Sequence, residues 1–264
     1  RWNDSIHHGG LLRPAGRMTN RTVAIIQARM GSQRLPGKVL CDIAGQSMLE
    51  RVVRRVQRSR LIDETVVATS VSDADDRIVS ACGEMGVAFT RGDEEDVLDR
   101  FRAAALAHDA TICVRVCADS PLIDPDVCDL AVATLRDSDP AGDYASNKLQ
   151  PSYPLGLDVE AFTIGALERA WRAATDAYQR SHVTVYIYES GEDFRLLPVR
   201  DAVDRHSWRW TVDTGDDLAF VREIFARLGG NNDFSYTDVV NLIENDPRLT
   251  LINAHVRPRA VLEG

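Results

Sequence analysis

Short apolar runs alternate with amphipathic helical patterns through the first half of the chain. The runs have the length of buried strands, and between them apolar residues recur every three or four positions, as they do on one face of a helix. We expect strands at residues 23–26, 65–69, 87–90 and 111–116 and helices at 48–56, 74–85, 96–108 and 126–136. This order predicts the α/β class, with a Rossmann-like, mostly parallel twisted sheet that carries helices on both faces.

The second half of the chain is less regular. Turn-rich segments at 144–147 and 152–162 lead into strand-like residues, and the alternating run 208–213 predicts a late strand. Helices are expected at 164–177, 216–228 and 236–245, whereas 182–188 fits either a helix or a strand. No repeat or linker divides residues 22–264, which we therefore predict to form a single domain. Residues 1–21 show no periodicity and are interpreted as a disordered extension, an upstream translated segment or a remnant of cloning.

Composition argues against several classes of partner. The chain of 264 residues has a formal net charge of -9, whereas binding to a nucleic-acid backbone needs an extended basic surface. No apolar run approaches the ~18 residues of a membrane-spanning helix. The five cysteines offer no second Cys/His pair for zinc, and Cys113 and Cys117 would share one face of a strand as reduced thiols. We therefore expect a cytoplasmic protein without nucleic-acid or membrane partners.

A loop that contains three cations follows the first expected strand. Arg29, Arg34 and Lys38 lie among small residues in the stretch ARMGSQRLPGK. Clustered cations, together with amides that glycine leaves accessible, are suited to binding a polyphosphate. The loop is not a P-loop, because five residues instead of four separate Gly31 from Gly37 and no hydroxyl residue follows Lys38.

Two aspartates that follow apolar runs predict a metal site. Open α/β sheets bind ligands at the carboxyl ends of their strands, and Asp119 follows the expected strand 111–116. Asp213 ends the expected strand 208–213. Mg²⁺ takes one or two carboxylates from the protein and completes its shell with phosphate oxygens, so this pair suits a magnesium–nucleotide complex. The alternative is that each aspartate caps a helix, a role that we assign to Asp124.

Several motifs, in the same order along the chain, resemble those of one enzyme family. The loop from Ala28 to Lys38 matches every fixed position of the pattern Ala-Arg-x-x-Ser-x-Arg-Leu/Ile-Pro-x-Lys, which is typical of sugar-activating cytidylyltransferases. Further matches are Arg91–Arg100, Arg115–Asp124 and Thr211–Thr214, within a resemblance that runs from about Val23 to about Asp217. Among the members, the chain is most similar to the spore coat polysaccharide biosynthesis protein F type, and less so to the CMP-KDO and CMP-sialic acid synthetases.

The resemblance implies a Mg²⁺-dependent nucleotidyltransferase with the nucleotide-diphospho-sugar transferase fold. Such an enzyme transfers CMP from CTP to a small-molecule acceptor, here a sugar acid or related oxyanion, releases pyrophosphate, and acts as a homodimer in polysaccharide biosynthesis. The implied catalytic residues are Arg29, Lys38 and Asp119, with Asp119 and Asp213 as ligands of Mg²⁺. The implied nucleotide-binding residues are Ala28, Arg29, Gly31, Ser32, Arg34, Lys38, Thr69, Ser70 and Arg91. The implied acceptor-binding residues are Tyr153, Gly156, Asp158, Glu160 and His182.

Other interpretations of the function stay open at this point. The acceptor loop departs from both the KDO and the sialic acid types, and some relatives act on small hydroxyalkylphosphonates, which form a second class of acceptor. A glycosyltransferase that uses a nucleotide sugar would share the fold, although its usual Asp-x-Asp is replaced by Ala118-Asp119-Ser120. A nucleotide-binding protein without catalytic activity would keep the same cations. His182 fits three roles: an acceptor contact, a base, or a packed and hydrogen-bonded histidine.

Overall fold

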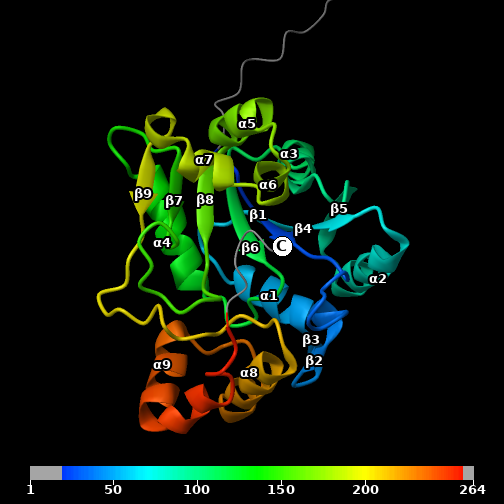
Figure 1. The fold of residues 1–264 in the computed structure, drawn as a ribbon, viewed down its shortest axis with the longest axis vertical. Coiled ribbons are helices and arrows are strands. Elements are labelled where there is room, and N and C mark those ends of the chain that lie inside the picture. Colours follow the sequence, from blue (N-terminus) through cyan, green and yellow to red (C-terminus); the bar gives the residue numbers. More distant parts are fainter. Residues whose placement is uncertain (1–19, 258–264) are drawn as a thin grey trace, which may run out of the picture.

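The computed structural model describes residues 20–257, whose strands form one large sheet and one small hairpin (Figure 1). The large sheet has the strand order β5-β4-β1-β6-β8-β7-β9. Its strands are β1 (Thr22–Gln27), β4 (Glu64–Ser70), β5 (Ala88–Gly92), β6 (Ile112–Cys117), β7 (Tyr144–Ser146), β8 (Glu160–Thr163) and β9 (Leu196–Pro198). Strand β8 runs antiparallel to β6 and β7, and the other pairs are parallel. The predicted mostly parallel sheet is therefore confirmed.

Helices cover both faces of this sheet, as the sequence predicts. They are α1 (Met48–Val56), α2 (Asp76–Met85), α3 (Val97–Ala107), α4 (Pro125–Arg136), α5 (Ile164–Ala173), α6 (Ala177–Ser181), α7 (Val185–Glu189), α8 (Gly215–Arg227) and α9 (Tyr236–Asn245). Short 3-10 helices lie at Lys38–Leu40, Asp73–Asp75, Gly191–Asp193 and Pro247–Leu251. Side chains of α1, α2, α4, α8 and α9 share one hydrophobic core, and those of α3, α5 and α7 share a second. Alternate residues of β1 divide between the two cores, because successive side chains of a strand point to opposite faces.

The carboxyl ends of the parallel strands lie along one edge of the sheet, here called the ligand edge. The strand order reverses beside β1, because β4 lies on one side of it and β6 on the other. Open α/β sheets bind ligands at such a reversal. The loops that follow β1, β4, β6, β7 and β9 all leave from this edge. The segments that carry the predicted site residues therefore meet at one place.

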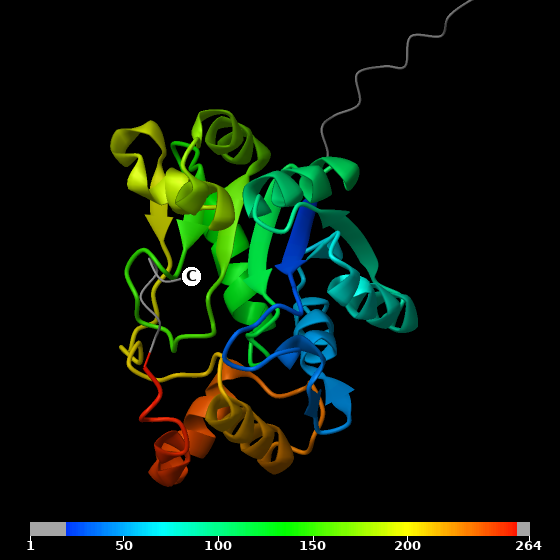
Figure 2. The ribbon, with the colours of Figure 1, turned by 45° about the vertical axis from the view of Figure 1, so that its right-hand side comes forward.

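Two buried arginines of α1 connect this edge to the C-terminal helices. Arg51 and Arg55 are 1% and 0% exposed, and their guanidinium groups donate to backbone carbonyls. The carbonyls bonded to Arg51 are those of Ile43, Ala44 and Gly230, and those bonded to Arg55 are Ile123, Asn232 and Phe234. These bonds join the hairpin of β2 (Asp42–Ile43) and β3 (Gln46–Ser47), the loop after β6 and the segment before α9. Helices α8 and α9 lie at the end of the molecule opposite α5 (Figures 1 and 2).

The structure corrects two of the predicted elements. Residues 208–213 do not form a strand, because their one ladder contact among the described residues is a bridge between Leu155 and Arg209. The predicted helix 164–177 is wrong in its length. Helix α5 ends at Ala173, and a separate helix, α6, begins after its N-cap residue Asp176. The ambiguous segment 182–188 contains helix α7. The other predicted helices and strands are present, α1 and α9 with the predicted bounds.

The described residues also bear on the predictions made from composition. The five cysteines are free thiols, with Cys113 buried and Cys117 half-buried. No helix within residues 20–257 is long and apolar enough to cross a membrane. Residues 1–19 of the predicted extension lie outside the described residues. Arg21, the last residue of the predicted extension, is described. Its carbonyl accepts from the amides of Thr111 and Ile112, so regular pairing begins at Arg21.

Gly156 lets the loop between β7 and β8 lie directly on the segment 208–213. Its φ is +107°, and an added Cβ would lie 2.3 Å from the amide nitrogen of Thr211. Gly156→Ala is therefore expected to lower the free energy of unfolding by about 2–3 kcal/mol, through left-handed strain and a backbone clash. Urea unfolding measures the loss, with Gly83→Ala in α2 as the control, because nothing lies within 4 Å of a Cβ there. Equal midpoints for the two variants would contradict this account.

Candidate active site

An ammonium group lies at the centre of the predicted site. Nζ of Lys38 donates to Oδ2 of Asp119 at 2.7 Å, to Oδ1 of Asp213 at 2.9 Å and to the carbonyl of Val212 at 2.7 Å. Burial alone would lower the pKa of Lys38, but the charges of the two carboxylates outweigh burial and raise it above its ordinary value. Lys38 is therefore a fixed positive charge that joins the loop after β6 to the segment before α8.

Two arginines complete the surroundings of Asp213. Its Oδ2 lies 2.8 Å from Nη2 of Arg34 and 2.7 Å from Nη2 of Arg209. Burial alone would raise the pKa of Asp213, but the Lys38 charge and the hydrogen bonds from Lys38 and Arg209 lower it. Asp119 differs, because Lys38 is its one ion-pair partner in the described part of the chain. The site therefore holds one heavily neutralised carboxylate beside one that is paired once.

Arg29 has no partner within residues 20–257. It is exposed, and neither a hydrogen bond nor an ion pair engages its guanidinium group. Arg29 acts on two basic groups. Burial and the charge of Arg29 both lower the pKa of the buried Arg100, and the charge of Arg29 also contributes to lowering the pKa of His182. An unpaired cation at the ligand edge is available for an anion that the protein itself does not supply.

Asp75 fixes the cation loop and was not predicted. Its Oδ1 accepts from the amide of Met30 at 2.7 Å. Its Oδ2 accepts from the hydroxyls of Thr69 and Ser70, at 3.1 and 2.5 Å. Both of these residues are fully buried, and the hydroxyls that we predicted to bind nucleotide donate to Asp75. The only signal in the sequence is the acidic run Ser72–Asp76 after the strand, which resembles an ordinary helix start.

The other predicted nucleotide-binding residues surround the same loop. Arg91 braces the turn after β4, because its guanidinium group donates to the carbonyls of Ser70 and Ser72 at 2.8 and 2.9 Å. Ala28 is buried at the end of β1, and Gly31 is exposed with its Cα facing the Glu94 carboxylate. The hydroxyl of Ser32 accepts weakly from the amide of Leu35 at 3.4 Å. The side chains of Arg29 and Arg34 are exposed at this loop, whereas the amides of Met30, Ser32, Leu35, Gly37 and Lys38 are bonded within the protein.

The predicted acceptor loop is closed at its base by Asn147. The Asn147 side chain donates to the carbonyl of Leu157 at 2.7 Å and accepts from the amide of Val159 at 2.9 Å. Tyr153 is 9% exposed and packs against Tyr236, with ring centroids 5.5 Å apart. Tyr153 and Gly156 are therefore buried parts of the loop. Asp158 is more exposed than either of them.

Glu160 is a buried counter-ion beneath this loop. It is 3% exposed, and its carboxylate receives Arg115 at 2.5 Å, Lys148 at 3.2 Å and the hydroxyl of Tyr144 at 2.7 Å, together with the hydroxyl of Thr184. Burial alone would raise its pKa, but the charges of Lys148 and Arg115 and these hydrogen bonds lower it to about 2. The structure thus assigns Glu160 a role in holding cations at the ligand edge.

Glu160 is expected to make folding stability depend on pH in a defined window. Its folded pKa of about 2 lies below the ordinary value of 4.5, so its contribution is fully present above pH 4.5 and is lost as the pH falls toward 2. The loss is on the order of 2 kcal/mol. Urea unfolding between pH 5 and 2.5 measures it, and Glu160→Gln is expected to show a shallower dependence. Identical slopes for the two proteins would show that this group is not the origin.

His182 and Asp158 lie close enough to the same cations to respond to them. His182 is half-buried at the end of α6, and its ring packs on Tyr178 with centroids 4.7 Å apart. Burial and then the charges of Arg115, Lys148 and Arg29 lower the pKa of His182, which is therefore neutral at pH 7. Burial is the main cause that raises the pKa of Asp158.

Asp119 and Asp213 are compatible with one divalent cation bound together with a polyphosphate. Within residues 20–257 no group of three or more His, Cys, Asp or Glu side chains could hold a metal by itself. Oxygens of both aspartates nevertheless lie within 2.9 Å of the same ammonium nitrogen, so they already share one cation. Mg²⁺ typically takes only one or two protein carboxylates and fills its remaining positions with phosphate oxygens and water. The donor set therefore fits Mg²⁺ bound with a nucleotide.

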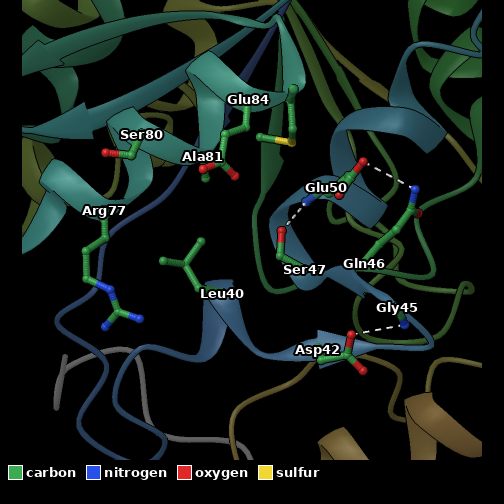
Figure 3. Close-up of a pocket in the computed structure, with 11 residues that line it drawn as sticks. Leu40, Asp42, Gly45, Gln46, Ser47, Glu50, Arg77, Ser80, Ala81 and Glu84 are labelled. Carbon is green, nitrogen blue, oxygen red and sulfur yellow. Dashed lines mark hydrogen bonds between the residues drawn. The ribbon is translucent and has the colours of Figure 1, made fainter.

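A cavity of about 520 Å³ lies elsewhere, between α2 and the β2–β3 hairpin (Figure 3). The carboxylates of Asp42, Glu50 and Glu84 lie around it, with Arg77 at its rim. Three carboxylates against one cation would repel a polyphosphate. None of the predicted site residues lines this cavity, so it is not the nucleotide site.

Comparisons with known proteins show which family this chain resembles. A family model described as cytidylyltransferase matches residues 23–210. The spore coat polysaccharide biosynthesis protein SpsF of Bacillus subtilis is 32% identical over 236 residues, which are 86% of this chain and 96% of that protein. A 3-deoxy-manno-octulosonate cytidylyltransferase of Geobacter sulfurreducens is 44% identical over 117 residues, 44% of this chain and 45% of that protein. The solved structure of a cytidylyltransferase from Leptospira borgpetersenii has a TM-score of 0.85 at 28% identity, and the match covers 92% of this chain and 100% of that one.

These matches differ in how much of the chain they include. The family model contains the cation loop and Asp119 but ends before Asp213. The match to SpsF spans most of both proteins, whereas the 3-deoxy-manno-octulosonate enzyme matches less than half of each. The resemblance inferred from the motifs is confirmed. The chain belongs to the cytidylyltransferase family.

Proposed function

We propose that this protein is a CTP-dependent cytidylyltransferase that transfers CMP to a sugar acid or related oxyanion acceptor and releases pyrophosphate. The observation that carries the proposal is the combination of Arg29, which is unpaired within residues 20–257, with an ammonium of Lys38 that bridges two carboxylates at the ligand edge. The first supplies a cation without a partner, and the second brings together the groups that a metal–nucleotide complex needs.

The charges at this edge support the proposed reaction. An acceptor oxygen attacks the α-phosphorus of CTP and loses its proton, a new P–O bond forms, and the bond to the β-phosphate oxygen breaks to release pyrophosphate. Negative charge grows on the leaving oxygens, where Arg29 and Arg34 can neutralise it. Lys38 can donate to a phosphate oxygen once its own carboxylate partners have another cation. Most of the work is positioning and charge neutralisation, so no strong general base is required.

Asp119 and Asp213 would hold Mg²⁺ in this proposal. When bound, the ion would screen the phosphate charges and polarise the phosphoryl group. The residues around it would then keep Asp213 ionised, through Arg34 and Arg209.

The proposal extends to the biological setting. The similarity to SpsF supports a role in polysaccharide biosynthesis, and the family resemblance supports a homodimer in the cytoplasm. Size-exclusion chromatography with light scattering tests the dimer. A hydroxyalkylphosphonate remains the second class of acceptor, since a cation-lined edge would accept its charge as well.

The proposal is tested by pyrophosphate release. Each of the four nucleoside triphosphates is incubated with Mg²⁺ and a panel of sugar acids, neutral sugars and hydroxyalkylphosphonates. Release with CTP and one class of acceptor is the expected result. Calorimetry without an acceptor separates the failures: CTP binding without release on any acceptor would indicate a binding protein, and no CTP binding would overturn the proposal.

A further inference from the structure

The chain uses lysine at only two positions. Of its 31 Lys and Arg residues, 29 are arginine, and the two lysines are Lys38 and Lys148. Both lie at the ligand edge, and both donate to carboxylates, Lys38 to Asp119 and Asp213 and Lys148 to Glu160. Lysine presents a compact ammonium, whereas arginine presents a planar fork, so the two are not equivalent at a binding site. Lys38 belongs to the nucleotide site already described, and Lys148 has no role there.

Lys148 lies on the loop that carries the predicted acceptor-binding residues. It lies two residues after β7, at the start of the loop that carries Asp158, and its side chain is 37% exposed. The Glu160 oxygen that it contacts at 3.2 Å also receives Arg115 at 2.5 Å. One buried carboxylate thus faces two cations, of which Arg115 is 9% exposed and Lys148 is the accessible one. The ammonium of Lys148 is held in place but is not fully neutralised by its partner.

Asp158 supplies a complementary group on the same loop as this ammonium. It accepts no hydrogen bond within the described residues, and the charges of Lys148, Glu160, Asp119 and Arg115 all act on it. A carboxylate with free lone pairs is an acceptor for hydroxyl groups. The same charge would repel a second negative charge on a ligand. An ammonium on the same loop as such a carboxylate therefore suits a monoanion with several hydroxyls better than a dianion.

We propose that Lys148 binds the carboxylate of the acceptor and that Asp158 accepts hydrogen bonds from its hydroxyls, so that the acceptor is a sugar acid and not a hydroxyalkylphosphonate. This inference rests on the proposed cytidylyltransferase activity. Glu160 and Arg115 act as positioning residues, because they hold the Lys148 ammonium at the edge without being accessible themselves.

The two lysines make the test direct. In the full chain labelled with ¹³C at lysine Cε, only Lys38 and Lys148 give side-chain signals, and Lys148→Arg assigns them. CTP with Mg²⁺ is expected to shift the Lys38 signal. A panel of 2-keto-3-deoxy sugar acids, added with a non-hydrolysable CTP analogue, is expected to include members that shift the Lys148 signal. Neutral sugars of matching skeleton and hydroxyalkylphosphonates are expected to leave that signal in place.

Kinetics give an independent readout. Lys148→Met is expected to raise the KM for the sugar acid about 10- to 100-fold while kcat and the KM for CTP stay within about twofold, and Lys148→Arg is expected to restore part of the loss. Arg60→Met is the control, because Arg60 is an exposed cation before β4, at the opposite edge of the sheet.

The outcomes separate the two proposals. A Lys38 signal that CTP does not move argues against the cytidylyltransferase itself. A Lys38 shift without a Lys148 shift on any sugar acid overturns the acceptor assignment alone. The acceptor assignment is also wrong if a phosphonate supports pyrophosphate release, or if Lys148→Met leaves the acceptor KM unchanged.

Discussion

Replacing Lys38 with methionine is expected to slow pyrophosphate release from CTP at least about 100-fold, or about 3 kcal/mol of transition-state stabilisation. In the described part of the chain, the ammonium is the one side-chain group that contacts both Asp119 and Asp213. Methionine keeps much of the volume of the side chain but leaves the two carboxylates facing each other without a cation. Steady-state assays with saturating acceptor measure the loss. Turnover within tenfold of the wild type would remove Lys38 from the catalytic machinery.

The same variant has a second readout that does not depend on catalysis. In the wild type the ammonium occupies the space between the two carboxylates, so a divalent cation must compete with it. Lys38→Met is therefore expected to bind Mn²⁺ in the absence of nucleotide at least about tenfold more tightly. Electron paramagnetic resonance titration measures free Mn²⁺, and Asp119→Asn in the same background is expected to abolish the gain. An unchanged Mn²⁺ affinity would mean that these carboxylates do not form the metal site.

Arg29→Ala is expected to reduce activity by a similar factor, about 3 kcal/mol, while leaving the unfolding midpoint unchanged. Arg29 is exposed and makes no hydrogen bond or ion pair within residues 20–257, so its removal breaks no contact of the folded protein. The loss should appear in the affinity for CTP and in kcat, because the charge meets the phosphates in both states. Isothermal titration with CTP and thermal unfolding are the two measurements.

The matched control for this variant is Arg60→Ala at the opposite edge of the sheet, which is expected to change neither activity nor CTP binding. A drop in thermal stability for Arg29→Ala would indicate a structural role. Full activity would exclude Arg29 from phosphate binding.

Most of the fold could be predicted from the sequence because its signals are local. Helices α1 and α9 begin and end at the predicted residues, with Ser47 and Ser235 as their caps. The prediction of a strand at 208–213 was wrong for a non-local reason. Its residues alternate as in a strand, but a strand also needs a neighbouring backbone along its length. Within residues 20–257 the segment forms a single bridge, with Leu155. Alternation alone does not reveal whether such a neighbour exists.

The site likewise has parts that local sequence signals predict and parts that depend on distant contacts. The cation loop and the two aspartates could be predicted because each lies at the end of an apolar run. The pairing of Lys38 with Asp119 and Asp213 depends on contacts between residues 81 and 175 positions apart, respectively, which no spacing rule supplies. The role of Glu160 was hidden because its partners come from other strands and loops, and that of Asp75 because its link to the cation loop is an amide 45 positions away. Thr69 and Ser70 were placed near the right loop, but their burial against Asp75 could not be read from the chain.

The arginines of α1 determine how much of the chain is needed for an intact folding unit. Arg55 is completely buried, and two of the carbonyls that accept from it belong to Asn232 and Phe234. A chain cut where the family match ends, at residue 210, would leave this guanidinium without those acceptors in an apolar environment. It would also leave Lys38 with Asp119 alone, since Asp213 lies beyond the cut. The helices after residue 210 are therefore part of the minimal protein and not an appendage that can be trimmed.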